Sequence, residues 1–340
     1  MNRRSVSKLG WLAAVVIVAL IAVNMKDDTV DSAASDEVAV PSSTIRIGVS
    51  QTPLSAPLIV ASNLGLFKLQ GLNVTLIPCN GGVVCSNDMF KGEVDYATAS
   101  ESVAMFSSFK RSDFVLLSSF VSSDNDMKLL TLSSGRIRDV SELKGKKVGV
   151  VKASSSEFYL DSVLIASGLN PLDVERVYYA PDKMDQALFS HKVDAISVWE
   201  PWGYRTEMGA NTDVINLGLV GIYDLSFNLM TMKNYAEQHR EQHYKILEAL
   251  HAAIIWINQN PDKAQQIIAT DLGIRQHQLE WSWHDYSFRL SLGNALLANL
   301  ELQARWAIDN KLVKGNMPDY RMIFDSDALS KVLQTEVSAK

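Results

Sequence analysis

From Ile45 onward, short hydrophobic runs of period two alternate with longer runs of helical spacing. We expect strands at 45–49, 74–77 and 96–99, separated by helices at 58–67, 86–91 and 102–109. Strands that alternate with helices predict a parallel sheet covered on both faces, and such sheets place ligands at the carboxyl ends of their strands.

The same alternation starts again after a polar turn at 143–147. We expect strands at 148–151, 174–179 and 195–199, a helix that opens at 154–156 and ends at Gly168, and a second helix at 184–189. Two α/β units are therefore predicted in tandem before residue 220.

The pattern after Asn228 becomes helical. Apolar residues recur every three or four positions in 244–257, Asn260 and Pro261 are typical of a helix start, and 278–312 is also predicted to be helical. A mostly helical end must cover one of the two sheets, so we expect the chain to leave the first lobe, build the second and return. This predicts lobe 1 at 44–130 and 225–325, lobe 2 at 131–224, a C-terminal tail at 326–340, and hinge crossings near 131–134 and 222–229.

The first 25 residues have the layout of an export signal, because Arg3, Arg4 and Lys8 precede an apolar run at 9–23. The run is shorter than the roughly 20 residues that span a bilayer, which favours a cleaved signal peptide. No clear cleavage site follows, so an N-terminal membrane anchor with its start in the cytoplasm stays open. Residues 26–43, rich in Ser, Ala and Asp, are expected to form a flexible linker.

Composition excludes some classes of protein. A chain of 340 residues with 47% hydrophobic content can bury a sizeable core, and a net charge of -6 argues against nucleic-acid binding. Two cysteines, Cys79 and Cys85, flank Gly81 and Gly82. In an oxidising compartment they could form a disulfide worth about 2 kcal/mol by loop entropy, and two free buried thiols are the alternative.

Several short motifs, in order along the chain, resemble the solute-binding proteins of nitrate, sulfonate, taurine and thiamine-pyrimidine-precursor ABC importers. The motifs are IGVS at 47–50, LSAPL at 54–58, NLGLF at 63–67, GLNV at 71–74, KGEVDYA at 91–97, LKGKKVGV at 143–150 and VDAISVWEP at 193–201. The resemblance covers about residues 44–325 and implies an α/β, two-lobe type II periplasmic-binding fold with a ligand cleft between the lobes. It implies as partners a small-molecule ligand and the permease and ATPase subunits of a transporter.

Candidate ligand-binding residues follow the strands. Gln51 and Ser55 come after the first strand, and Ser100 and Glu101 after the third, where the resembling family places ligand contacts. Glu101 has the alternative role of a first-turn acid that stabilises its helix dipole.

The second lobe adds two groups of candidates and one weaker residue. Ser154, Ser155 and Ser156 open a helix, so each either caps it or faces an anionic ligand. Trp199 and Glu200 could stack a ring and hold a cationic nitrogen, or form a core tryptophan and an ion pair with Arg205. Asp224 lies near the return crossing, where a hinge or surface role is equally compatible.

These residues favour a binding protein in the periplasm or another extracytoplasmic compartment, possessing no catalytic site, metal or cofactor and acting as a monomer. The prevalence of acids and hydroxyls favours a sulfonate that also carries an amine, or an aminopyrimidine, over nitrate. His239 and His243 lie one helical turn apart, but Glu241 between them is not at the position that zinc-protease motifs require, so an exposed polar helix face is expected. Pyrimidine-synthesising enzymes of the resembling family carry a cysteine-rich motif that this chain lacks, and a tethered ligand sensor is a further alternative.

Overall fold

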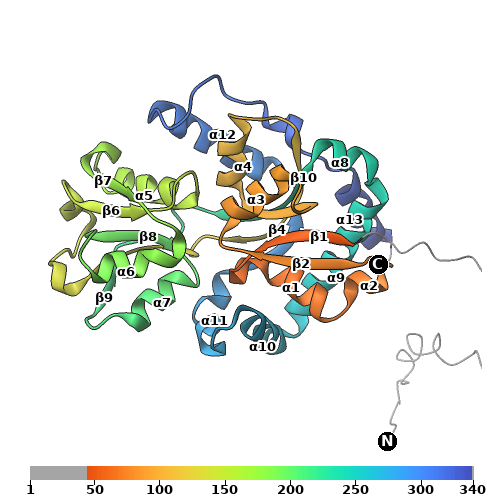
Figure 1. Ribbon diagram of the computed structural model, residues 1–340, viewed down its shortest axis with the longest axis horizontal. Coiled ribbons are helices and arrows are strands. Elements are labelled where there is room, and N and C mark those ends of the chain that lie inside the picture. Colours follow the sequence, from red (N-terminus) through yellow and green to blue (C-terminus); the bar gives the residue numbers. More distant parts are fainter. Residues whose placement is uncertain (1–43, 339–340) are drawn as a thin grey trace, which may run out of the picture. The chain divides into compact units, whose positions relative to one another are not determined.

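The computed structural model describes residues 44–338, and the side chains of residues 44–334. These residues form two α/β lobes, each built around its own sheet (Figure 1). The expected signal peptide or anchor at 1–25 and the linker at 26–43 lie outside the described residues. Between residues 44 and 338, no helix combines the length and the apolar character needed to cross a membrane.

Lobe 1 contains a six-stranded sheet with the order β11-β4-β10-β3-β1-β2. Strand β1 runs parallel to β2 and β3, whereas β10 is antiparallel to β3 and β4, and β11 is antiparallel to β4. The strands are β1 (Ile45–Ser50), β2 (Val74–Cys79), β3 (Tyr96–Ser100), β4 (Phe114–Ser123), β10 (Leu225–Met232) and β11 (Ser287–Ser291).

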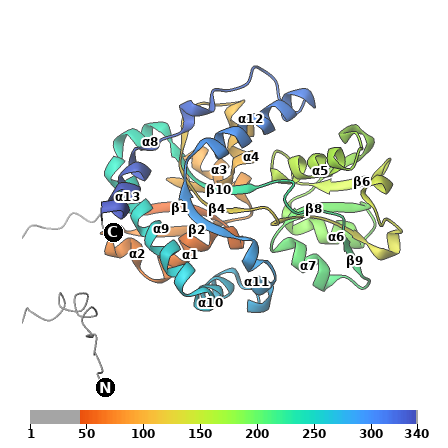
Figure 2. The same cartoon turned by 180° about the vertical axis from the view of Figure 1, so that it is seen from behind.

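Helices cover both faces of this sheet, with α3, α4 and α12 on one side and α1, α9 and α10 on the other (Figures 1 and 2). The helix expected over 58–67 is divided into α1 and α2, because Gly65 between them has the left-handed φ of 70°. The helices are α1 (Ala56–Asn63), α2 (Leu66–Leu69), α3 (Gly82–Lys91), α4 (Glu101–Ser108), α8 (Lys233–Gln238), α9 (Arg240–Gln259), α10 (Pro261–Leu272), α11 (Gln276–Ser282), α12 (Asn294–Asp309) and α13 (Asp327–Ser338).

Lobe 2 contains a five-stranded sheet with the order β7-β6-β8-β5-β9. Helix α5 (Ser155–Ala166) packs on one face, and α6 (Met184–Phe189) and α7 (Trp202–Gly209) pack on the other. The strands are β5 (Met127–Leu132), β6 (Lys147–Val150), β7 (Glu175–Tyr178), β8 (Ala195–Trp199) and β9 (Val214–Asn216). The structure confirms the mixed α/β architecture of two sheets flanked by helices.

The first crossing between the lobes lies earlier than expected. Strand β5 pairs with β8 in lobe 2, so the chain leaves lobe 1 at 124–126 rather than near 131–134. Strands β4 and β5 are buried on both faces, and such strands lack the alternation that would have separated them in the sequence. The return crossing runs from Leu217 to Asp224, between β9 and β10.

Two expectations for the C-terminal part were wrong. The helix expected at 278–312 is interrupted by β11, in which Phe288 and Leu290 are buried and alternate with more exposed residues. Residues 326–340 are not simply a tail, because 327–338 form α13, which packs on α9. Its buried Ala328, Leu329 and Val332 lie on one face of a helix.

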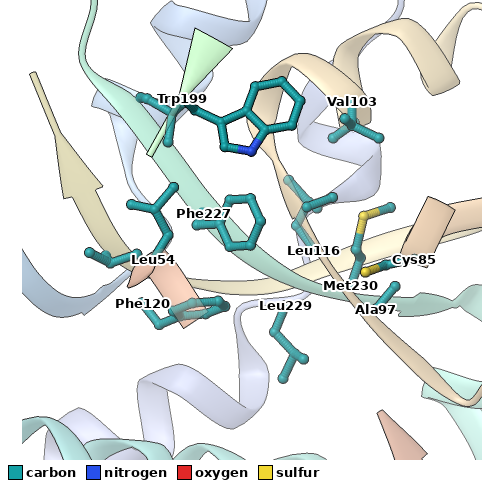
Figure 3. Packing of buried hydrophobic residues seen from close by; sticks show 14 of the residues in the cluster. Leu54, Cys85, Ala97, Val103, Leu116, Phe120, Trp199, Phe227, Leu229 and Met230 are labelled. Atoms are coloured by element: carbon teal, nitrogen blue, oxygen red, sulfur yellow. The ribbon is translucent and has the colours of Figure 1, made fainter. Parts of the chain in front are cut away.

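A disulfide joins Cys79, at the end of β2, to Cys85 in the first turns of α3, with 5.5 Å between their Cα atoms. Figure 3 shows Cys85 beside Met230 and Ala97, which are partners across β10 and β3. The bridge therefore fastens the beginning of α3 to the core of lobe 1.

We predict that replacing both cysteines by alanine lowers the free energy of unfolding by about 2 kcal/mol, because the closed loop is short and its entropy cost in the unfolded chain is correspondingly modest. Denaturation in urea, with and without reductant, measures the effect. Reductant should destabilise the wild-type protein and leave the Cys79→Ala/Cys85→Ala variant unchanged. Equal sensitivity of the two proteins would contradict the bridge.

Candidate functional site

A pocket lies between the two lobes at the carboxyl ends of parallel strands. It encloses about 420 Å³ of space not filled by protein atoms, part of it open to solvent. Lobe 1 contributes residues that follow β1, β2 and β3 and residues of β10, and lobe 2 contributes residues that follow β6 and β7 and the end of β8. A molecule in this pocket contacts both lobes.

Helix starts surround the pocket. The N-cap residues Thr52, Gly81, Ser100 and Ser154 all line it, and they precede a 3-10 turn (Pro53–Ser55), α3, α4 and α5 respectively. The first N–H groups of a helix have no intrahelical acceptor. Thr52 and Ser154 cap their helices with their side chains, whereas Gly81 and Ser100 do not. Backbone donors therefore converge on the pocket from both lobes.

Gly81 brings the two lobes into close contact. Its φ of 92° is unfavourable for other residues, and a Cβ atom at this position would lie 3.4 Å from the ring of Trp199. The indole of lobe 2 thus lies against the start of α3 in lobe 1. Figure 3 shows the indole above Phe227, with Leu54 and Val103 on either side.

Three serine hydroxyls in the pocket have no partner. Ser50, Ser100 and Ser155 are 2%, 5% and 4% exposed, and their hydroxyls make no hydrogen bond with any described residue. The indole N–H of Trp199 likewise has no acceptor among residues 44–334. These atoms are accessible from the pocket and are not sealed in the core, so donors from both lobes are available to a polar ligand.

The pocket is otherwise uncharged and largely apolar. None of the described residues that line it carries an ionisable side chain. Leu54, Val103, Leu225, Phe227 and Trp199 supply an apolar wall. The arrangement can bind a ligand that has a hydrogen-bond-accepting head and an apolar body.

The structure brings four of the predicted site residues together, namely Ser100, Ser154, Ser155 and Trp199. Gln51 lines a neighbouring hollow beside Trp202 and Arg205. Asp224 lines a separate hollow that also contains Arg289.

Two predicted serines have internal partners. The Ser55 hydroxyl donates to the Ser50 carbonyl at 2.7 Å. The Ser156 hydroxyl donates to the Ser197 carbonyl at 2.7 Å and accepts from the N–H of Val151 at 3.1 Å. These bonds hold the strand ends beside the pocket, and neither residue lines it.

Glu101 is fully buried and turned away from the pocket. Its carboxylate accepts from the hydroxyl of Tyr223, the amide of Gln303 at 2.8 Å, and the N–H and hydroxyl of Ser226 at 2.7 and 2.9 Å. Burial raises the pKa of Glu101, and these hydrogen bonds offset part of the shift. The sequence showed that Glu101 begins a helix but not which way its side chain points.

Glu200 is also buried and outside the pocket lining. Its carboxylate accepts from the N–H of Tyr204 at 3.1 Å. The alternative ion pair with Arg205 does not form, because Arg205 lies over the ring of Trp202 at 4.8 Å. Burial raises the pKa of Glu200 to about 7, and the nearby Lys128 opposes the shift. Burial likewise raises the pKa of the neighbouring Asp126 to about 7.

Sequence reasoning missed the contribution of α3. Asn80, Gly81, Gly82 and Val83 line the pocket at the point where β2 passes into α3. A Gly-Gly pair after a strand and between two cysteines was the available signal, because glycine permits the backbone to approach a ligand closely.

Direct hydrogen bonds connect the lobes around the pocket. The hydroxyl of Thr52 donates to the Glu200 carbonyl at 3.0 Å, and the amide of Asn80 donates to Asp182 at 3.0 Å. Farther away, the indole N–H of Trp306 donates to Asp161 at 2.9 Å. The structure therefore has its lobes in contact on several sides of the pocket.

Comparison with known proteins gives a family match over most of the described chain. The model of the NMT1/THI5-like family matches residues 52–264. A putative aliphatic sulfonates-binding protein of Bacillus subtilis is 25% identical over 228 residues, which are 66% of this chain and 68% of that protein. Putative binding proteins of Brucella species are 23% identical over 43% of their length.

Solved structures share the fold. The alkanesulfonate-binding protein SsuA from Xanthomonas axonopodis pv. citri, bound to MOPS, has a TM-score of 0.73 at 18% identity and is matched over 98% of its length and 83% of this chain. The nitrate-binding protein NrtA from Synechocystis has a TM-score of 0.71 at 13% identity, covering 89% of that chain and 87% of this one. The desulfurization enzyme DSZB has a TM-score of 0.64 at 17% identity, covering 99% and 86%.

We predict that Glu200→Gln stabilises the protein at pH 8 and not at pH 4.5. The folded pKa of about 7 lies above the ordinary value of 4.5, so the folded state binds more protons than the unfolded state between these values. The free energy of unfolding of the wild-type protein therefore falls as pH rises from 4.5 to about 7. The glutamine side chain does not ionise, so the variant lacks the part of this fall that Glu200 causes. Urea denaturation should give a gain of about 3 kcal/mol at pH 8.

The matched control is Glu175→Gln, which neutralises an acid on the surface of lobe 2. Its effect on stability should be small at both pH values. If Glu200→Gln changed stability equally at pH 4.5 and pH 8, the carboxyl would not titrate as its burial requires.

Proposed function

Because the chain belongs to the NMT1/THI5-like family, we propose that it is an extracytoplasmic solute-binding protein that closes its lobes over a small organic anion. The closed form is then recognised by the membrane subunits of an ABC importer, and the protein acts as a monomer without a cofactor. The observation that carries this proposal is the set of unpaired hydroxyls of Ser50, Ser100 and Ser155, which come from both lobes and line one pocket.

Two helix N-termini suit an anionic group. Helix α3 in lobe 1 has no side-chain cap, and the first residues of α3 and of α5 in lobe 2 line the pocket. The positive end of a helix dipole and its free N–H groups attract anions without a charged side chain. The start of α4 already holds a negative charge of the protein itself at Glu101, so we assign the anion to α3 and α5.

The lining favours a sulfonate with an apolar body. Three sulfonate oxygens can accept from the serine hydroxyls, the backbone N–H groups and the Trp199 indole. The apolar wall of Leu54, Val103, Leu225 and Phe227 is left for a hydrocarbon or aromatic part. Nitrate has no such part to bury. An aminopyrimidine or an amine-bearing sulfonate would need acceptors for its N–H groups, and the carboxylates of Glu101 and Glu200 are turned elsewhere.

The relatives support this class of ligand. The Bacillus subtilis relative is described as a putative aliphatic sulfonates-binding protein, and SsuA is described as alkanesulfonate-binding. Hydrogen bonds to a charged group contribute about 1.5–3 kcal/mol each. Three of them and the burial of the apolar body are compatible with micromolar affinity, which requires about 8 kcal/mol.

We predict that Ser155→Ala weakens sulfonate binding about 10- to 100-fold and leaves the stability of the unliganded protein unchanged. The Ser155 hydroxyl has no partner in the described chain, so its loss costs nothing until ligand binds. Thermal-shift titration of residues 44–340 with alkanesulfonates, taurine, aminopyrimidines and nitrate, followed by calorimetry, measures both quantities.

The matched control is Ser156→Ala, one residue away, which removes two internal hydrogen bonds. It should lower the melting temperature of the unliganded protein, whereas Ser155→Ala should leave that temperature unchanged. If no sulfonate raised the melting temperature of the wild-type protein while another class did, the proposed ligand class would be wrong.

An enzyme is the second candidate, because DSZB shares the fold. We predict that an alkanesulfonate incubated with the protein is recovered unchanged and that no sulfite is released. Ion chromatography with a sulfite assay measures this. Sulfite that increases with time and protein concentration would favour the enzyme, and binding without chemical change supports the importer or a tethered sensor.

A further inference from the structure

Glu101 is a buried carboxylate whose hydrogen bonds come from distant parts of the chain. Its donors are Tyr223 on the return crossing, Ser226 in β10 and Gln303 in α12, and together they provide four hydrogen bonds. A carboxylate has about four acceptor positions, so its capacity is filled. No cation of the described residues forms a salt bridge with it. Burying such a charge is costly compared with an apolar residue, which suggests a requirement for specific geometry.

The residues around Glu101 alternate between this cluster and the pocket. Ser226 binds the carboxylate, whereas its neighbours Leu225 and Phe227 line the pocket. Ser100 precedes Glu101, lines the pocket and is the β-sheet partner of Phe227. One carboxylate thus holds β10 and the start of α4 in the relative position that forms the pocket wall in lobe 1.

Tyr223 extends this linkage to lobe 2. Its hydroxyl bonds to Glu101 and lies 3.2 Å from the hydroxyl of Ser102, both in α4. Its ring packs against Phe158 of α5, with the two centroids 5.1 Å apart, and also against Tyr159. Tyr223 therefore contacts α4 of lobe 1 and α5 of lobe 2, the two helices whose N-cap residues, Ser100 and Ser154, line the pocket.

The position of Tyr223 in the chain makes this contact sensitive to lobe movement. It lies on the return crossing, which must change its direction when the lobes rotate. Ring contacts tolerate sliding, but a hydroxyl-to-carboxylate hydrogen bond weakens steeply when its distance or angle changes. A change in the direction of the crossing that shifts the Tyr223 hydroxyl relative to α4 would therefore break this bond.

We propose that Tyr223 is a positioning residue that, through its hydrogen bond to Glu101, fixes the angle at which the lobes close over ligand. The expected effect of Tyr223 on affinity rests on the proposed binding function. Its expected effect on the lobe angle does not depend on which ligand binds. Tyr223 lies outside the pocket lining, so we assign it no ligand contact.

The test compares Tyr223→Phe with Tyr178→Phe. The first removes the hydroxyl that binds Glu101 and keeps the ring. The second removes a hydroxyl that donates to the carboxylate of Glu157 at 2.8 Å, a bond that lies within lobe 2 and away from the crossings. Spin labels at the exposed positions Lys68→Cys in lobe 1 and Lys192→Cys in lobe 2 report the interlobe distance by double electron–electron resonance. An alkanesulfonate is the ligand probe.

We expect Tyr223→Phe to broaden the interlobe distance distribution, with and without ligand, and to weaken binding on the order of tenfold. Tyr178→Phe should leave the distribution narrow, because its hydrogen bond lies within one lobe. Identical distributions for the two variants would overturn the inference. If the wild-type protein binds no sulfonate, the proposed ligand class fails, and the distances without ligand still decide the role of Tyr223.

Ser226→Ala supplies a second variant in case Tyr223→Phe does not fold. It removes one donor to Glu101 and retains the backbone N–H bond. A broadened distribution supports the role of the cluster in fixing the lobe angle, and an unchanged one contradicts it.

Discussion

The pocket depends on one constraint, that helix N-termini carried by two separate sheets must meet within the reach of a single small molecule. Each parallel strand leads into its helix at the same edge of the sheet, so each lobe alone presents only part of the donor set. Helix α3 belongs to one sheet and α5 to the other, and Trp199 fits against Gly81 only when these sheets approach. Under the proposed function, ligand binding and the approach of the lobes are thermodynamically one event, since only the arrangement with the lobes in contact offers all the donors.

The ionisable residues next to the pocket make contacts inside the lobes and do not line the pocket. Glu101 organises lobe 1 and its link to α5, and Glu200 lies buried near Lys128 and Asp126 at the first crossing. In each case a residue beside the carboxylate lines the pocket, Ser100 in the first and Trp199 in the second. The same strand-to-helix turns therefore supply both an uncharged residue that lines the pocket and a buried acid beside it.

Much of the fold was predictable from the sequence, and less of the site. Strands such as β6 and β8 are bounded by turns and follow helical runs, so periodicity located them within one residue. Strands β4, β5 and β10 are buried at almost every position, which leaves no alternation to detect. The sequence could place Ser155 at the start of a helix and Trp199 at the end of a strand. It could not show which way their side chains point. Ser155 and Ser156 are adjacent and chemically identical, yet only the first faces the pocket, because backbone geometry decides between them.

The disulfide has a consequence for when the protein becomes competent to bind. It closes the loop that contains Asn80, Gly81 and Gly82. The disulfide therefore restricts the movement of the backbone N–H groups that we assign to the anion. In a reducing compartment this loop, with two glycines, would keep its conformational freedom and each binding event would have to order it. Before the disulfide forms, the chain would bind solutes weakly. It would reach its full affinity for ligand only after Cys79 and Cys85 are oxidised.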